Sequence, residues 1–263
     1  MVKKISDLPS ISIVIPSYNK VSYIRATLQS IVDQKYSNLE IIIHDGGSTD
    51  GTLEIIKSFA KKYSQLFKWE SKKDNGQLDA INKGLNKATG EVLSFINADD
   101  VFKRGVLLEV GHHFKKYPDT VWLTGYGDII DKDGKVISPL VTGYKNTLLK
   151  INKYSLLLAV NFITQPATFL SKKAYEQFGP FTGTKNYVME YELWLKLGKV
   201  RMPNVIKKTL ASFRLTADNI SSTASRELLG IDYQLVKKYT KNPFLLALHK
   251  LHNLGRIFLL NFL

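Results

Sequence analysis

The chain has 263 residues and is 44% hydrophobic, which suffices for one large α/β domain with or without a small appendage. It contains no cysteine, so disulfides, thiolate metal sites and a cysteine nucleophile are excluded. The formal net charge of +14 predicts an anionic partner, such as nucleic acid, phospholipid headgroups or a phosphorylated substrate, although a lysine-rich surface can also serve solubility alone.

The N-terminal segment MVKKISDLPS has two lysines but no long apolar stretch ahead of the first strand-like run. A secretory signal would need such a stretch, so none is predicted. We therefore expect cytoplasmic residence.

From Ile11 to about Thr124, short β-rich runs alternate with helix-length amphipathic runs. The β-rich runs are ISIVI, LEIIIH, LFKWE, EVLSFI and TVWLTG, and the helical runs fall at 23–33, 52–62, 77–88 and 105–115. This alternation predicts a Rossmann-like α/β fold, with a mostly parallel central sheet flanked by helices. In such a sheet, ligands bind beyond the carboxyl ends of the strands.

Polar clusters stand at the ends of four of these strands: PSYNK, DGGSTDGT, KKDNG and NADD. In DGGSTDGT, glycines let the backbone approach a ligand, while Ser48, Thr49 and Asp50 can cap the next helix. The chain has neither GxxxxGK followed by Ser or Thr nor GxGxxG, which argues against a P-loop NTPase and a classical dinucleotide fold. Four polar strand ends facing one crevice indicate a ligand site.

The stretch SFINADD ends a buried strand on two adjacent carboxylates, Asp99 and Asp100. Two like charges repel each other unless a cation or hydrogen bonds compensate them. One or two carboxylates commonly hold Mg²⁺ or Mn²⁺ whose other ligands are phosphate oxygens and water. We therefore expect a divalent metal at Asp100 and Asp99.

After about residue 125 the pattern changes. YGDIIDKDGKVI predicts a hairpin, FITQPATFLSKKAYEQFG a strand and a helix, VMEYELWLKLGK a helix, and NVIKKTLASFRL a strand. No linker separates two domains, so we expect one domain over 1–240, whose second half extends the same sheet and supplies one side of a cleft.

Residues 241–263 are leucine-rich, but polar and basic residues interrupt the run too often for a membrane-spanning helix. An amphipathic helix is predicted, with Leu248, Leu251, Phe258 and Phe262 on one stripe. It could pack on the protein's own core, on a second subunit, or in a membrane interface with the help of nearby lysines.

The segments SIVIPSYNKVSYIRATLQSIVDQKYSNLEIIIHDGGSTDGTLEII, DNGQLDAINKGLNKATGEVLSFINADD and MEYELWLKLG occur in this order. Over about residues 10–200 the chain resembles the family 2 glycosyltransferases, and within them the bacterial polysaccharide-assembling branch with DGGSTDGT and NADD. The resemblance implies a GT-A fold with an acceptor-side C-terminal extension, in which about 10–124 form the nucleotide-sugar-binding half and 125–240 the acceptor half. It also implies sugar transfer from a nucleotide-diphosphate donor with inversion at the anomeric carbon.

The resemblance further implies roles for individual residues. The donor would be bound by Pro16, Tyr18, Asn19, Asp45, Asp74, Asp79, Asn82 and Asp99, with Asp100 and Asp99 at the metal, Mn²⁺ or Mg²⁺. Family members usually place a general-base aspartate at the start of a DyxLWLRL helix; here EYELWLKL puts Glu190 in that position, with Glu192 as the second choice.

Four positions depart from the family pattern: Gly46 replaces the second acid of DDGS, Asn97 the first aspartate of DADD, Thr216 a histidine near the metal, and Glu190 an aspartate. We expect an acceptor glycan that is lipid-linked, a role in cell-surface polysaccharide synthesis, and peripheral contact with the inner membrane face. Two alternatives stay open: a nucleotide-sugar-binding relative with weak activity, and a binding module for nucleic acid or another anionic polymer. No recognised nucleic-acid motif occurs, so nucleic acid is not an expected partner.

Overall fold

The computed structural model describes residues 7–183, 188–216 and 226–260, with the side chains of 226–228 and 256–260 left aside. In this part of the chain nine strands form one sheet in the order β3-β2-β1-β4-β8-β6-β9-β5, with β7 paired to β6. The strands are β1 (Ile11–Ser17), β2 (Leu39–Asp45), β3 (Phe67–Ser71), β4 (Val92–Phe95), β5 (Val101–Phe102), β6 (Trp122–Ile130), β7 (Val136–Ile137), β8 (Thr168–Ser171) and β9 (Asn204–Arg214). The predicted α/β fold is confirmed.

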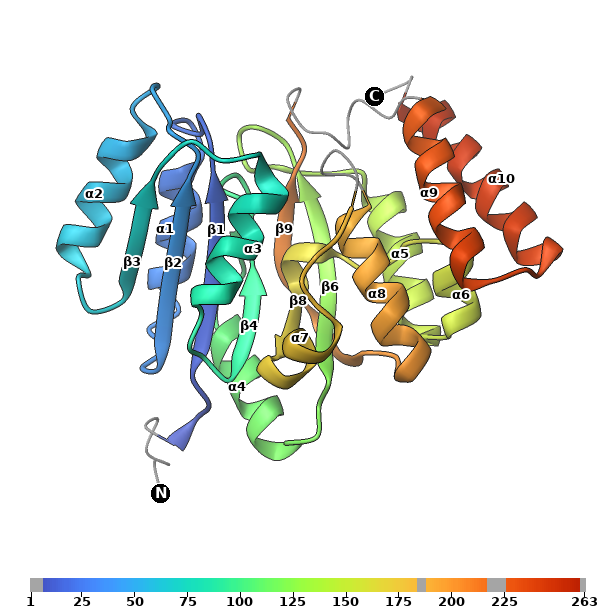
Figure 1. The fold of residues 1–263 in the computed structure, drawn as a ribbon, viewed down its shortest axis with the longest axis horizontal. Helices are drawn as coiled ribbons and strands as arrows, with labels where there is room; N and C mark the ends of the chain where they lie inside the picture. Colours follow the sequence, from blue (N-terminus) through green and yellow to red (C-terminus); the bar gives the residue numbers. More distant parts are fainter. Residues whose placement is uncertain (1–6, 184–187, 217–225, 261–263) are drawn as a thin grey trace.

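Strand direction brings the polar strand ends to one edge of the sheet. β1, β2, β3 and β4 are parallel, so they end on the same side (Figure 1). β8 runs antiparallel to both β4 and β6, and β9 runs parallel to β6. β9 therefore ends at this same edge, and the second half of the chain extends the sheet of the first.

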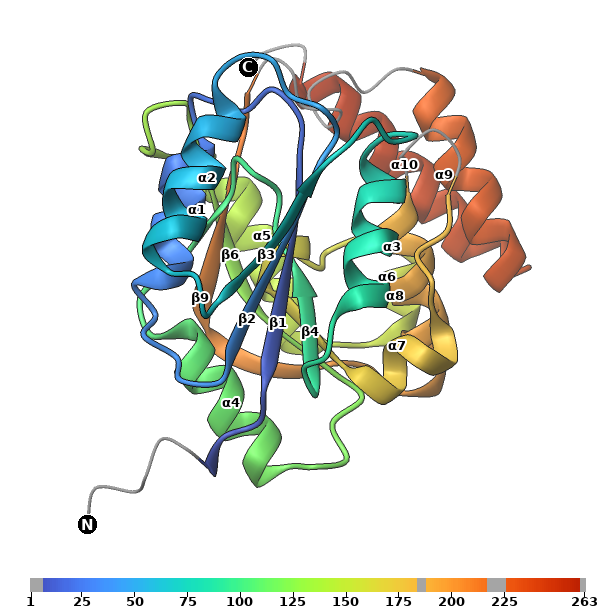
Figure 2. The same ribbon diagram turned by 60° about the vertical axis from the view of Figure 1, so that its left-hand side comes forward.

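Helices cover both faces of the sheet. They are α1 (Ile24–Val32), α2 (Thr52–Lys62), α3 (Gln77–Lys87), α4 (Val106–Lys116), α5 (Pro139–Ile151), α6 (Tyr154–Ala159), α7 (Lys172–Phe178), α8 (Met189–Val200), α9 (Arg226–Tyr239) and α10 (Pro243–Leu260), with a 3-10 turn, η2, at Gln165–Ala167. Figure 2 shows α1, α2 and α4 on one face, and α3, α7 and α8 on the other.

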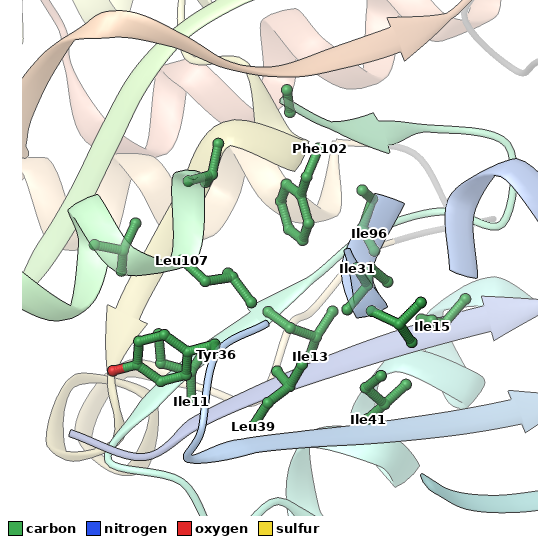
Figure 3. Close-up of a cluster of buried hydrophobic side chains, with 14 of the residues drawn as sticks. Ile11, Ile13, Ile15, Ile31, Tyr36, Leu39, Ile41, Ile96, Phe102 and Leu107 are labelled. Carbon is green, nitrogen blue, oxygen red and sulfur yellow. The ribbon is translucent and has the colours of Figure 1, made fainter. Parts of the chain in front are cut away.

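The side chains of the central strands alternate between the two faces of the sheet, and each face has its own hydrophobic core. Ile13 and Ile15 of β1 pack toward α1 and α4, where Ile31 and Leu107 meet them (Figure 3). Val14 points the opposite way, into a second core that contains the stacked Trp122 and Trp194 rings. Because a strand's side chains alternate between faces, one strand can anchor both layers.

Three helices were not anticipated from the sequence: α5, α6 and α9. α10 packs against α6 and α9 at the end of the molecule farthest from β3 (Figure 1). In the described residues, no helix combines the length and the apolar character needed to cross a bilayer.

Candidate functional site

The loops that follow β1 and β2 are joined to each other by hydrogen bonds. The backbone N–H of Asn19 donates to Ser48 Oγ at 2.8 Å, and the N–H of Thr49 donates to Asn19 Oδ1 at 3.0 Å. Asn19 has a φ of 49°, a left-handed conformation that asparagine tolerates better than most residues. Beside it, Tyr18 is 61% exposed, whereas Pro16 is buried inside β1. Of the predicted donor contacts on this loop, Tyr18 and Asn19 are thus open to solvent, whereas Pro16 is not.

Asp45 is fully buried at the end of β2, and its carboxylate already has several donors. Oδ2 accepts the N–H groups of Gly47 at 3.1 Å and Ser48 at 2.9 Å. The hydroxyl of Ser71 donates to the same oxygen at 2.6 Å, and that of Ser48 donates to Oδ1 at 2.5 Å. Asp45 therefore fixes the glycine-rich loop.

The Asp74 carboxylate lies close against Gly46. A Cβ built at Gly46 would lie 3.1 Å from Asp74 Oδ2, and the N–H of Gly76 donates to Asp74 Oδ1 at 2.8 Å. His44 Nε2 lies 3.7 Å from Asp74 Oδ2, while its Nδ1 lies 2.7 Å from Glu70 Oε1. A carboxylate is therefore present beside position 46, although this position has no side chain.

The two predicted donor residues on α3 are both engaged with protein partners. Asp79 pairs with Lys83 at 2.7 Å and accepts the Asn75 N–H at 3.0 Å, and these contacts hold the pKa of Asp79 below its ordinary range. Asn82 donates to the Phe181 carbonyl at 2.9 Å and accepts the Phe181 N–H at 3.0 Å. Asn82 therefore ties α3 to the segment that follows α7.

The paired carboxylates follow β4, and they differ in what they touch. Asp100 is 0% exposed; its Oδ1 accepts the backbone N–H of Arg214 at 2.8 Å, and its Oδ2 lies 3.4 Å from Asn97 Nδ2. Asp99 Oδ2 forms an ion pair with Lys20 Nζ at 3.0 Å. Asn97, the departure from the family pattern, thus acts as a donor to the neighbouring carboxylate.

Arg214 holds this pair from the end of β9. β5 pairs antiparallel with β9, which places Asp100, immediately before β5, beside the end of β9. Arg214 Nε donates to the Asp99 carbonyl at 2.8 Å, and its terminal nitrogen donates to the carbonyls of Asp131 at 2.8 Å and Lys132 at 3.0 Å. The guanidinium therefore connects the carboxylate pair to the β6–β7 turn.

The electrostatics of the pair suit a divalent cation. Burial, and then the neighbouring Asp99 carboxylate, raise the pKa of Asp100 well above its ordinary range, although Arg214 and Asn97 oppose the shift. In the described residues no group of three or more acidic or histidine side chains could hold a metal. The protein therefore offers two carboxylates. They fit Mn²⁺ or Mg²⁺, because both ions prefer oxygen ligands and a bound cation would stabilise the charged form of Asp100.

Glu190 stands in the first turn of α8, between the buried Met189 and Tyr191, and is half-buried itself. Burial raises the pKa of its carboxyl. In the described residues, no ion pair or hydrogen bond from another residue reaches this carboxylate. Glu190 has the character of a group that can gain and lose a proton, although no described contact joins it to Asp99 or Asp100.

Glu192, the second candidate base, points to a different place. Its Oε2 accepts the Thr182 hydroxyl at 3.0 Å, and Lys196 Nζ reaches the same hydroxyl at 3.3 Å. Glu192, Lys196 and Thr182 line an open cavity of about 720 Å³ between α8 and α9.

Two residues of the strand-end cluster were given no role from the sequence. Lys20 pairs with Asp99, and Gln77 Nε2 donates to Asn97 Oδ1 at 2.6 Å. Lys20 belongs to the polar run PSYNK, so its place at the site could have been predicted from the sequence. No sequence pattern predicts the contact between Gln77 and Asn97. Thr216, where the family places a histidine, is buried just after β9.

Comparison with known proteins identifies relatives of this chain. The profile described as glycosyl transferase family 2 matches residues 12–179, more than half of the chain. An uncharacterized glycosyltransferase of Haemophilus influenzae is 26% identical over 224 residues, covering 83% of this chain and 69% of that protein. One of Nostoc sp. is 35% identical over 132 residues, covering 50% of this chain and 41% of that protein. The chain thus spans less than half the length of the Nostoc relative.

Solved structures share the fold. The mannosyltransferase PcManGT from Pyrobaculum calidifontis, in complex with GDP-Man and Mn²⁺, superposes with a TM-score of 0.68 at 18% identity, covering 94% of this chain and 70% of that one. S. aureus TarS 1–349, in complex with UDP-GlcNAc, superposes with a TM-score of 0.61 at 15% identity, covering 95% of this chain and 72% of that one.

Proposed function

The chain belongs to glycosyl transferase family 2 and has the GT-A fold, and from this premise we propose that it moves a sugar from a nucleotide-diphosphate donor to a glycan acceptor with inversion at the anomeric carbon. The observation that carries the proposal is the buried pair Asp99 and Asp100 at the carboxyl edge of the sheet. Lys20 and Arg214 lie beside the pair and counter part of its charge, and a divalent cation would counter the rest.

The donor lies, in this proposal, across the ends of β1, β2 and β4. Tyr18 offers an exposed ring to the base, and Asp74 offers a carboxylate beside Gly46. The remaining predicted contacts, Pro16, Asn19, Asp45, Asp79 and Asn82, shape the loops around the donor through the hydrogen bonds and packing described above. Asp99 binds ribose or the donor sugar.

Asp100, with Asp99, would hold Mn²⁺ or Mg²⁺, which supplies charge neutralisation for the departing nucleotide diphosphate when it is bound. Lys20 pairs with Asp99 at 3.0 Å and is partly exposed, so its ammonium can turn toward an incoming diphosphate. Arg214 is fixed by three carbonyl groups and keeps the Asp99–Asp100 backbone in place.

Glu190 acts as the general base in this proposal. It removes the proton from the acceptor hydroxyl as that oxygen attacks the anomeric carbon opposite the leaving group. A carboxyl with a raised pKa is a stronger base than an ordinary glutamate, which suits this step. The proton ends on Glu190 Oε and the electron pair of the broken bond on the diphosphate.

The acceptor is proposed to be a lipid-linked glycan that is extended at the inner face of the cell membrane, in cell-surface polysaccharide synthesis. The net charge of +14 supports this location, because that membrane face is anionic.

A thermal-shift panel tests the proposal, because a ligand that binds only the folded state raises the unfolding midpoint. UDP-, GDP- and dTDP-sugars would be added with Mn²⁺, with Mg²⁺ and with a chelator; the structural neighbours bind GDP-Man and UDP-GlcNAc, so both classes belong in the panel. We expect a metal-dependent shift with one nucleotide class. No shift with any donor, together with tight salt-sensitive binding of nucleic acid, would overturn the proposal.

A further inference from the structure

The inner face of α10 carries two buried polar side chains among apolar ones that pack against the core. His249 is 1% exposed and Asn253 is 3% exposed. Asn253 Nδ2 donates to Asp232 Oδ2 of α9 at 3.0 Å and lies 3.0 Å from His249 Nε2. The His249 ring stacks on Tyr191 of α8 at 6.2 Å between centroids. Hydrogen bonds and ring contacts to α8 and α9 therefore fix which side of α10 faces the protein.

The outer face of α10 is apolar as a consequence. Phe244 is 68% exposed, Leu251 67%, Leu254 51% and Leu248 36%. At 100° per residue these four side chains point within one sector of the helix, opposite His249. Of the stripe predicted from the sequence, Leu248 and Leu251 lie on this face, while the side chain of Phe258 and the whole of Phe262 fall outside the described part.

The surroundings of this face are basic. From residue 233 to residue 263 the sequence contains no acidic residue. Lys237 and Lys238 end α9, Lys241 lies in the turn before α10, and Lys250 flanks the apolar face; all four are exposed. Figure 1 shows α10 at the outer end of the molecule, where α6 and α9 pack against it.

We propose that the outer face of α10, formed by Phe244, Leu248, Leu251 and Leu254, docks on an anionic phospholipid surface. An apolar helix face with lysines at its margins matches a bilayer interface, because the leucines enter the acyl boundary while the ammonium groups stay at the headgroups. A second copy of the chain fits this face poorly, because two-fold pairing would bring the same uncompensated lysines together.

This inference rests on the proposed function, because docking on the membrane would bring the enzyme to its lipid-linked acceptor. The helix would lie along the membrane plane. Its inner face stays joined to α8 and α9, so docking requires no unfolding of the described contacts.

Vesicle co-sedimentation tests the docking surface with the purified full chain. Vesicles of phosphatidylglycerol and phosphatidylcholine are compared with vesicles of phosphatidylcholine alone, at low and high NaCl. We expect binding to the anionic vesicles that weakens at high salt. The double variant Phe244→Gln/Leu251→Gln should bind at least about tenfold more weakly. The control Leu108→Gln changes an exposed leucine of α4 and should bind like the parent chain.

Three results would overturn the inference: no binding of the parent chain to anionic vesicles, unchanged binding of the double variant, or a dimer of the parent chain that becomes monomeric in the double variant. Measuring the donor-induced thermal shift on the same proteins distinguishes a failure of membrane docking from a failure of the proposed function. A double variant that keeps the donor shift while losing the vesicles supports docking by α10. A parent chain that binds vesicles but no donor refutes the proposed function and leaves the docking surface standing.

Discussion

The carboxylates at the strand ends and the carboxylate on α8 are held in opposite ways. Asp45 and Asp100 are fully buried, and both accept backbone N–H groups, Asp45 from the neighbouring Gly47 and Asp100 from the distant Arg214. Glu190 is buried less completely, and its pKa is raised by burial with no described cation beside it. The difference teaches how one fold separates two tasks: hydrogen bonds fix the positions of the strand-end carboxylates, whereas α8 presents a carboxyl that no other described residue holds by a hydrogen bond.

Removing the proton acceptor should have the largest effect. We expect Glu190→Gln to lower turnover by about 10²- to 10⁴-fold, because general-base catalysis contributes that much, while donor binding stays intact. Turnover assays and the donor thermal shift measure the two quantities. Glu192→Gln is the matched control, two residues along α8, and should be nearly silent. If Glu192→Gln is the damaging change, the base has been misassigned.

Weakening the fixed pair comes next. Asp100→Asn should lower turnover by about 10³-fold, because a bound metal stabilises the transition state by several kcal/mol. It should also remove the difference between donor shifts measured with metal and with chelator. Asp133→Asn, at an exposed turn carboxylate, serves as the control. A variant at Asp100 that kept a full metal-dependent shift would place the metal elsewhere.

The pH dependence should follow Glu190 in both rate and stability. Turnover should fall about tenfold per pH unit below its raised pKa, because the protonated carboxyl cannot accept a proton. Since the folded pKa lies above the ordinary 4.5, the stabilisation from Glu190 is complete below pH 4.5 and is lost as pH rises through the folded pKa. Glu190→Gln should remove this loss in urea titrations across that window, whereas Glu192→Gln should retain it.

The smallest effect concerns the glycine-rich loop. Asp45→Asn should lower the free energy of unfolding by about 1–3 kcal/mol, because one oxygen acceptor becomes an amide donor facing donors. Urea denaturation measures the change, with the exposed Asp119→Asn as control. An unchanged midpoint would mean that the hydrogen bonds at Asp45 add little to stability.

The sheet and its polar edge could be predicted because their signals are local. Alternating runs and turn residues define β1 to β4, and parallel strands must end together. The partners of the carboxylates were harder to predict, since they come from far along the chain. Arg214 meets Asp100 only because β5 pairs with β9, and such a non-local register leaves no periodicity to detect.

The orientation of the C-terminal helix α10 could not be predicted from the sequence either. Its stripe of leucines was visible in the sequence, but the stripe does not say which face packs on the protein. The answer depends on Asp232, which draws His249 and Asn253 inward. A buried polar cluster between helices has no sequence signature of its own, so the outward turn of Leu251 could not be predicted.

The bond from Arg214 N–H to Asp100 has a consequence for the order in which the protein is made. The two residues are 114 positions apart, so a nascent chain that has left the ribosome through β4 contains all four polar strand ends and still lacks their last support. Closing so long a loop comes late in assembly. A truncation that stops before β9 would therefore retain every family motif of the strand ends and yet leave Asp100 Oδ1 without the N–H that it accepts from Arg214, which makes the late strand the step that completes the site.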